Sequence, residues 1–312
     1  MDIAVHEEIN TPQTLGSIPR YVLLHNAISR SAHSLSAPAQ KLTLMAMALL
    51  PPDLSSLKAA FTFPEYCEAL ETEKGGRQYE IFQKAVDECM KCVIMIETGC
   101  NKKGKPSWEK FHWFIKSHFN SVTGQAEMEF SPTLAAFLIA SKWVYSKINL
   151  TDVGQLQSRY AIKLFEMAIS YMSLKGKDGN KYERWYFQRT VEELRLILNV
   201  PEDAYKTIKD FRKYVVENPI NEINDAEIGV KITPTGVKKG RKITGIRFEC
   251  EKTLRKLPVK KQRNEKHDQA PQPPLELPDN INAAITDLDL KLLKEKYPQG
   301  LVAIFEDQLA QP

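Results

Sequence analysis

The sequence predicts an α+β protein made of two tandem winged helix-turn-helix domains, related by internal duplication and followed by a Pro-linked C-terminal tail. Two observations support this: the same order of elements occurs twice, at an offset of roughly 125 residues, and each copy reads as three helices followed by a hairpin. A length of 312 residues fits about two domains of roughly 150 residues. The predicted divisions are 1–150, 151–256 and a tail at 257–312.

The first helix of each copy is predicted from apolar residues at helical spacing. These are Leu42, Met45, Ala46 and Leu49 in the first copy, and Tyr160, Leu164, Ala168 and Tyr171 in the second. A shorter helix follows, and both times it begins with a Thr-x-x-Glu capping box, in which each residue satisfies a backbone donor of the other. The two boxes are Thr62 with Glu65 and Thr190 with Glu193.

A third helix and a β-hairpin complete each copy. The third helices are predicted over 78–93 and 203–218, the second one after a turn at 200–202. In the second copy, two predicted strands flank a Pro-, Gly- and Lys-rich loop at 234–242. Alternate residues of these strands are apolar and are expected to point inward: Val230, Ile232, Ile246, Phe248 and Cys250. In the first copy, Ile94 and Ile96 lead through 99–104 to an aromatic segment at 111–119. This order of elements is that of a winged helix.

The charge is distributed unevenly along the chain. Residues 1–150 carry fifteen basic and fifteen acidic residues, residues 151–268 carry 25 and 17 (net +8), and residues 269–312 carry 3 and 7 (net −4). The second copy is therefore the candidate for binding a polyanion.

The third helix of the second copy is the candidate reading element. Helical spacing predicts that Ile208, Phe211 and Val215 are buried. It places a charged set on the opposite face, where the side chains could meet base edges or phosphates: Lys206, Lys209, Asp210 and Lys213. Arg212 lies on the flank and suits a phosphate. The alternative for such a face is a solvated, charge-rich surface.

The predicted wing favours DNA binding over that alternative. Its loop places four cations within five positions, suited to phosphates or the minor groove: Lys238, Lys239, Arg241 and Lys242. The corresponding helix face of the first copy is mixed in charge, with Glu80, Gln83, Lys84 and Asp87. We expect the first copy to serve mainly as a dimer interface, with minor backbone contacts through Lys84, Lys102 or Lys103.

Other classes of protein fit the sequence less well. No apolar run is long enough to span a bilayer and the N-terminus does not read as a signal peptide, so a cytoplasmic protein is expected. Five scattered cysteines indicate free thiols. A zinc site at Cys89, Cys92, Cys100 and His112 is an alternative to cysteine as apolar core filler, which we favour. Without a phosphate-binding loop or catalytic cluster, we expect no enzyme activity, metal or cofactor.

Three stretches resemble the plasmid iteron-binding, theta-type replication initiator (Rep) family, relatives of the F-plasmid and pi initiators. They are LQSRYAIKLFEM at 156–167, VEELRLILNVPEDAYKTIKDFRKYVVENPINEIN at 191–224 and KKGRKITGIRFE at 238–249. The resemblance implies two winged-helix domains, of which the second reads double-stranded iteron DNA and the first dimerises.

The resemblance also implies how the protein works. Monomers bind tandem iterons and open an origin with the host replication initiator and helicase, while homodimers in equilibrium with them repress their own promoter. Base reading falls on Lys206, Lys209, Asp210 and Lys213. Arg212 and the four wing cations bind phosphates, and Ser158 and Arg159 hold another phosphate at a helix start.

The sequence departs from the family pattern at two points. Pro219 predicts a kink or restart of the third helix, and lysines replace several arginines, which predicts looser base reading. Three other functions stay open: a winged-helix transcriptional repressor without origin function, a rolling-circle nickase and an interaction scaffold.

The chain beyond residue 256 reads as a separate tail. A basic and Pro-rich linker at 260–274 leads to a short acidic segment with helical spacing at 281–297. This segment is either a docking helix or a simple tail. Its negative charge suggests that it competes with DNA for the basic domain, in which case deleting 269–312 tightens DNA binding.

Overall fold

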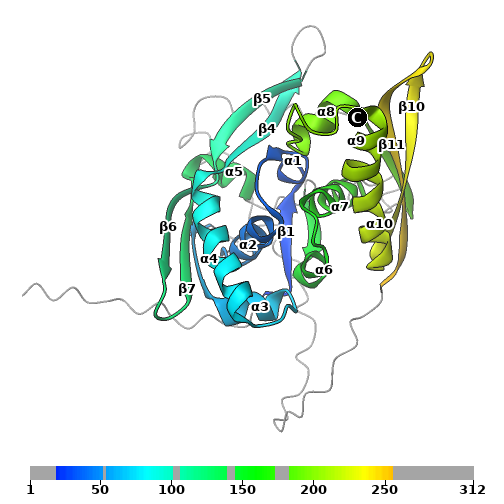
Figure 1. Cartoon of the computed structure of the whole chain (residues 1–312). Coiled ribbons are helices and arrows are strands. Elements are labelled where there is room, and N and C mark those ends of the chain that lie inside the picture. The colour runs from blue at the N-terminus through cyan, green and yellow to red at the C-terminus, as the bar shows by residue number, and fades with distance from the viewer. Residues whose placement is uncertain (1–18, 52–53, 101–105, 139–144, 173–182, 256–312) are drawn as a thin grey trace, which may run out of the picture.

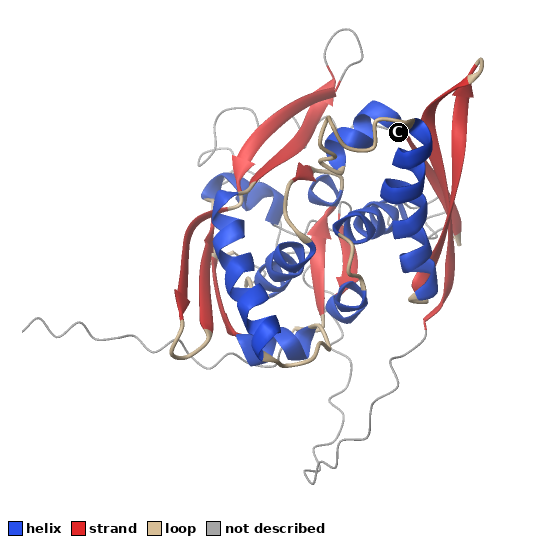
Figure 2. Cartoon of the chain, viewed as in Figure 1, coloured by secondary structure: helices blue, strands red, loops and turns tan. Residues whose placement is uncertain are grey.

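The computed structural model describes residues 19–51, 54–100, 106–138, 145–172 and 183–255 (Figure 1). The predicted tail, Lys102 and Lys103 lie outside these residues. Helices and the strand β1 form the centre of the molecule, with the β10–β11 hairpin at one side and the β6–β7 hairpin at the other (Figures 1 and 2). No helix in the described ranges is long and apolar enough to cross a membrane.

The first half of the chain, up to β8, contains most of the strands. Its elements are β1 (Tyr21–His25), α1 (Asn26–Ser29), β2 (Ala32–His33), α2 (Ala37–Ala48), β3 (Lys58–Thr62), α3 (Phe63–Ala69), α4 (Gly76–Lys91), β4 (Val93–Cys100), β5 (Pro106–His112), β6 (Phe114–Asn120), β7 (Gln125–Phe130), a 3₁₀ turn η1 (Pro132–Leu134), α5 (Ala135–Leu138) and β8 (Tyr145–Asn149).

The second half has fewer elements. They are α6 (Leu150–Gln155), α7 (Arg159–Met172), β9 (Arg184–Thr190), α8 (Val191–Ile197), α9 (Ile208–Phe211), a π-helical segment η2 (Arg212–Glu217), α10 (Asn218–Asp225), β10 (Ile228–Lys239) and β11 (Lys242–Arg255). The sequence analysis placed no strand directly before the second capping box, although buried Trp185 and Phe187 of β9 alternate with exposed Tyr186 and Gln188, as is typical of a strand.

Both capping boxes are confirmed. The Thr62 N–H donates to Glu65 at 2.6 Å and the Glu65 N–H donates to the Thr62 hydroxyl at 3.4 Å. The equivalent distances between Thr190 and Glu193 are 2.7 and 3.1 Å. Each box fixes the point at which a strand turns into the first helix of a helix-turn-helix.

The strand pairing corrects the predicted match between the two hairpins. In the second domain the order is β10-β11-β9, with Thr190 of the capping box opposite Gly245 of β11. In the first domain, Thr62 lies opposite Gln125 of β7, in a sheet of order β3-β7-β6. The equivalent of the second wing is therefore β6–β7. The β4–β5 hairpin, which the sequence suggested, pairs with β2 instead and belongs to a different sheet. The aromatic segment 111–119 is divided at Trp113 between β5 and β6.

Helix α7 joins the two halves. Its residues 161–170 are all buried, and one cluster of buried apolar side chains extends through both halves. Polar contacts also tie α7 to the first half: the Lys163 ammonium donates to the carbonyl of Ile28 at 2.9 Å, and the Arg30 guanidinium donates to Ser170 at 3.0 Å. The second-domain helices and hairpin are thus supported by a helix that is packed against the first domain.

Candidate nucleic-acid interface

The second domain contains a helix-turn-helix whose turn is held by one arginine. Arg195 of α8 donates to the carbonyl of Ala204 at 3.2 Å and also to that of Tyr205. Its guanidinium lies 5.1 Å from the centre of the Phe211 ring. Arg195 therefore links α8, the turn and the start of the next helix.

That next helix, named here the reading helix, is continuous over 208–225 (Figure 1). It starts five residues later than predicted, because Thr207 is its N-cap and accepts from the Asp210 N–H at 3.1 Å. Tyr205 has a left-handed backbone, with φ of +48°, which helical residues do not adopt. Lys206 consequently precedes the helix instead of lying on its face, and the prediction for that residue's position was wrong.

Pro219 does not end the reading helix. The backbone widens into a π-helical segment just before it, where the Asn218 N–H donates to the Lys213 carbonyl, five residues back. With more residues per turn, positions four apart lie nearly in line. This register keeps Phe211, Val215, Pro219 and Ile223 buried. The expected kink or restart is thus absorbed as a change of hydrogen-bond pattern, and the helix continues to Asp225.

The same register aligns the exposed cations. Lys209 and Lys213 are four residues apart and both exposed, and neither forms an ion pair with a residue that the structure describes. Ile208 was expected to be buried but is 37% exposed, because it is the first residue of the helix and lies above the packed core. Lys209 and Lys213 form the centre of the outward face.

Asp210 and Arg212 have partners within the helix. The Thr207 hydroxyl donates to the Asp210 carboxylate at 2.8 Å, and Arg212 pairs with Glu217 at 2.7 Å. Asp210 is therefore part of the N-cap, and a base or phosphate must compete with these contacts. The DNA-contact roles of both residues stay predictions.

The wing is a regular hairpin and not the nine-residue loop predicted. β10 and β11 remain paired up to Lys239 and Lys242, and Gly240-Arg241 forms a two-residue turn. Gly240 has φ of +62°, a conformation that glycine adopts easily and other residues do not. Lys238, Lys239, Arg241 and Lys242 are exposed at this tip, and none pairs with an acidic group among the described residues. The predicted inward residues, including Ile232 and Phe248, are buried.

Ser158 and Arg159 lie at the start of α7, as predicted, but other groups already occupy them. The Ser158 hydroxyl accepts from the Tyr160 N–H at 3.2 Å, and the Ser158 N–H donates to Glu222 at 3.2 Å. Arg159 donates to the carbonyl of Asn199 at 3.0 Å. A carboxylate thus lies where a phosphate was expected, so the phosphate role of these two residues stays a prediction that this geometry does not favour.

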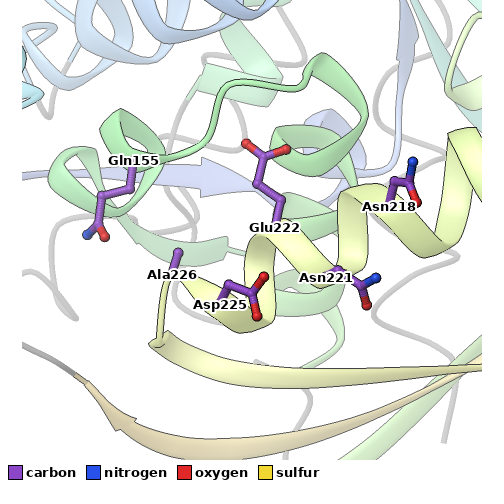
Figure 3. Close-up of a pocket in the computed structure, with 6 residues that line it drawn as sticks. All are labelled: Gln155, Asn218, Asn221, Glu222, Asp225 and Ala226. Atoms are coloured by element: carbon purple, nitrogen blue, oxygen red, sulfur yellow. The ribbon is translucent and has the colours of Figure 1, made fainter.

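An open depression of about 590 Å³ lies beside α10. Its lining is polar and acidic: Gln155, Asn218, Asn221, Glu222, Asp225 and Ala226. Figure 3 shows Glu222 projecting from α10 toward the chain that leads into α7. With two carboxylates and no cation in its lining, this depression does not suit a phosphate.

The first domain has no comparable cationic face on its third helix. Glu80, Gln83, Lys84 and Asp87 are exposed on α4 as expected, a mixed set of charges.

Cys89 and Cys92 are buried in the core, and burial raises the pKa of the Cys89 thiol to about 12. Within the described ranges, no three metal-binding side chains gather into a site.

Sequence reasoning missed three residues that shape this interface: Arg195, Tyr205 and Tyr214. The Tyr205 ring stacks on that of Tyr214, with ring centroids 5.6 Å apart. Helical periodicity could not connect them, because Tyr205 lies outside the helix. The sequence signal for Arg195 is equally weak, since its partners are backbone carbonyls.

Two family models match the chain. The model of the initiator replication protein WH1 domain matches residues 21–169, and that of the initiator Rep protein WH2 domain matches residues 190–250. Together they cover more than half of the chain. The first match ends within α7, the helix that contacts both halves.

The chain is similar to several solved structures. The Pi initiator protein in complex with iteron DNA has 18% sequence identity and a TM-score of 0.57, and the match covers 76% of this chain and 99% of that one. Domains 2 and 3 of RctB have 9% identity over 78% of this chain and 94% of that one, with a TM-score of 0.42. The likeness to Pi is close enough to indicate a shared fold. On the two family models, the chain belongs to the initiator replication proteins with tandem WH1 and WH2 winged-helix domains.

Proposed function

We propose that this protein initiates plasmid DNA replication by binding tandem origin repeats, or iterons, through its WH2 domain. The observation that carries the proposal is the set of exposed cations on the reading helix and wing tip, which have no ion-pair partner among the described residues. The likeness to the Pi initiator bound to iteron DNA supports it.

In the proposed complex, the reading helix enters the major groove. Lys209 and Lys213 meet guanine acceptors or nearby phosphates, and Lys206 reaches the groove from the turn before the helix. The wing cations Lys238, Lys239, Arg241 and Lys242 lie along the backbone or minor groove, where each neutralised phosphate contributes to salt-dependent affinity.

The chain acts in this proposal by binding and carries out no chemical step itself. Monomers on tandem iterons strain the adjacent duplex and recruit the host replication initiator and helicase. The WH1 domain, whose α4 face is mixed in charge, provides the homodimer interface. The dimer binds an inverted repeat at its own promoter and represses it. A cytoplasmic, DNA-associated location goes with this function.

A footprint of the purified full chain on the DNA flanking its own gene tests the proposal, at about 50 and about 200 mM salt. Direct repeats that are protected in phase, with a protection that weakens steeply at the higher salt concentration, support an iteron initiator. The variant Lys209→Gln/Lys213→Gln should lose this protection, whereas Lys58→Gln, a matched change at an exposed position on β3, should keep it.

The other outcomes favour other functions. Protection of a single inverted repeat alone indicates a transcriptional repressor. Metal-dependent nicking of a supercoiled plasmid indicates a nickase. Absence of any protection, with the lysine variants unchanged in DNA affinity, leaves the interaction scaffold and contradicts the proposal.

A further inference from the structure

An aromatic pair lies beside the cations of the reading helix. The ring of Tyr205, in the turn, stacks on that of Tyr214, in the helix, with 5.6 Å between centroids and 27° between planes. Neither residue belongs to the set of cations on which the proposed function rests. The turn between α8 and the reading helix places the Tyr205 ring next to that of Tyr214, nine positions later in the sequence.

The backbone of Tyr205 is held in an unfavourable conformation. Its φ of +48° is uncommon for a bulky residue, and such outliers persist only where the surroundings impose them. The surroundings here are Arg195, which donates to the carbonyls of Ala204 and Tyr205, and the Tyr214 ring. This conformation takes Tyr205 off the line of the reading helix and fixes the direction in which its ring leaves the turn.

Tyr214 presents a free polar group. The residue is 43% exposed, and its hydroxyl has no hydrogen-bond partner among the described residues. Lys213, its neighbour in the outward row, places its ammonium 5.0 Å from the centre of the Tyr214 ring. Phe211 and Val215 point into the core, so Tyr214 lies on the flank of the helix, between the core and the row of Lys209 and Lys213.

We propose that Tyr214 donates a hydrogen bond from its hydroxyl to a DNA phosphate, and that Tyr205 is the positioning residue that holds the ring in place. The inference rests on the proposed function for where the helix docks. A helix in the major groove faces base edges with its centre and phosphates with its flanks, and tyrosine is a common phosphate donor. Stacking on Tyr205 orders the Tyr214 ring before binding, which lowers the entropy lost in the complex.

Tyr214→Phe tests the contact because it removes only the hydroxyl. Affinity of the full chain is measured at several salt concentrations, on the protected duplex and on a scrambled duplex of equal length. We expect a loss of about tenfold on the protected duplex. The slope of log affinity against log salt should stay unchanged, because a neutral donor replaces no counterion. Equal affinity of Tyr214→Phe and wild type on both duplexes overturns the proposal.

Two changes at Tyr205 test the positioning role. Tyr205→Phe keeps the stacking ring and should bind as wild type. Tyr205→Gly removes the ring but accepts positive φ, so the turn keeps its backbone. We expect Tyr205→Gly to lose affinity to a similar extent as Tyr214→Phe, and the double variant to lose little more, since the two residues act as a unit. Fully additive losses contradict the coupling.

Tyr186→Phe is the matched control. Tyr186 lies on β9, is 58% exposed and contacts Arg247, so loss of its hydroxyl should not change DNA affinity. If wild type shows no preference for the protected duplex, the proposed function fails. The phosphate contact is then still decided on the scrambled duplex, where Tyr214→Phe must bind more weakly than both wild type and Tyr186→Phe.

Discussion

Glu222 of α10 accepts a hydrogen bond from the backbone N–H of Ser158 at 3.2 Å, and also one from the N–H of Gln157. The reading helix thereby provides a carboxylate at the N-terminus of α7, where the helix dipole favours negative charge. Since α7 is packed against the first domain, this contact helps to set the position of the reading helix relative to the rest of the molecule.

Glu222→Ala should destabilise the fold. It removes two hydrogen bonds to a charged acceptor and the favourable interaction with the helix dipole, so we expect a loss of roughly 1–2 kcal/mol in the free energy of unfolding. Urea unfolding measures it. Asp225→Ala is the control on the same helix, because Asp225 is exposed and has no ion-pair partner in the described part of the chain. Equal losses for the two variants contradict the proposed contribution of the α7 contact.

Arg159→Ala separates a structural role from a phosphate contact. Arg159 donates to the carbonyl of Asn199, so we expect a small loss of stability and an unchanged salt dependence of DNA binding. If Arg159 binds a phosphate instead, the slope of log affinity against log salt falls by about 0.9. A titration at four salt concentrations distinguishes the two results.

Lys209→Gln and Lys213→Gln should each weaken DNA binding and reduce that slope by about 0.9 if each lysine neutralises one phosphate. If a lysine reads a guanine instead, its variant should lose discrimination between the protected and scrambled duplexes. Lys58→Gln, at an exposed position on β3, should change neither quantity. If the Lys209 and Lys213 variants behave like Lys58→Gln, the outward face of the reading helix is only solvated.

The sequence predicted the parts of this interface that depend on local chemistry. Both Thr-x-x-Glu boxes and the alternation of Ile232 and Phe248 are local patterns, and they are confirmed. Lys206 was misplaced because helical periodicity continued through Tyr205, whose positive φ is imposed by Arg195 from another helix. The pairing of β7 with β3 was missed because it joins residues far apart in sequence. The break expected at Pro219 takes the form of a change from π-helical to α-helical hydrogen bonding at Asn218, and this form has no simple sequence pattern.

Lys163 and Glu166 form a buried ion pair on α7, 3.3 Å apart. Burial lowers the pKa of Lys163 and raises the pKa of Glu166, while each charge partly offsets this effect on the other. Lys163→Met leaves a buried carboxylate unpaired, so we expect a loss of about 3–5 kcal/mol in stability near pH 7. Lys163→Met/Glu166→Leu should recover much of it, as measured by urea unfolding.

The Lys163→Met variant should also depend on pH in a defined direction. Without its partner, Glu166 has a folded-state pKa still further above the unfolded value of about 4.3. The folded state then holds a proton that the unfolded state releases, so the stability of the variant falls as pH rises above about 4.3. The deficit relative to wild type should therefore be smaller at pH 5 than at pH 7. A deficit that does not change with pH would contradict this account.

His25 should make the protein less stable in mild acid. Its Nδ1 accepts from the Ala27 N–H at 3.1 Å and caps α1, and burial together with the Arg30 charge lowers its pKa to about 4. The unfolded histidine has a pKa near 6.5, so between about pH 6.5 and pH 4 it is protonated while the folded histidine is still neutral. Stability is therefore retained above about pH 6.5 and lost as pH falls toward 4.

His25→Asn can still cap α1 and should flatten this part of the pH profile, whereas His118→Asn, at an exposed position on β6, should leave it unchanged. Thermal melts of the three proteins between pH 4 and pH 7 decide the matter, and parallel profiles for wild type and His25→Asn would assign the acid sensitivity to another group.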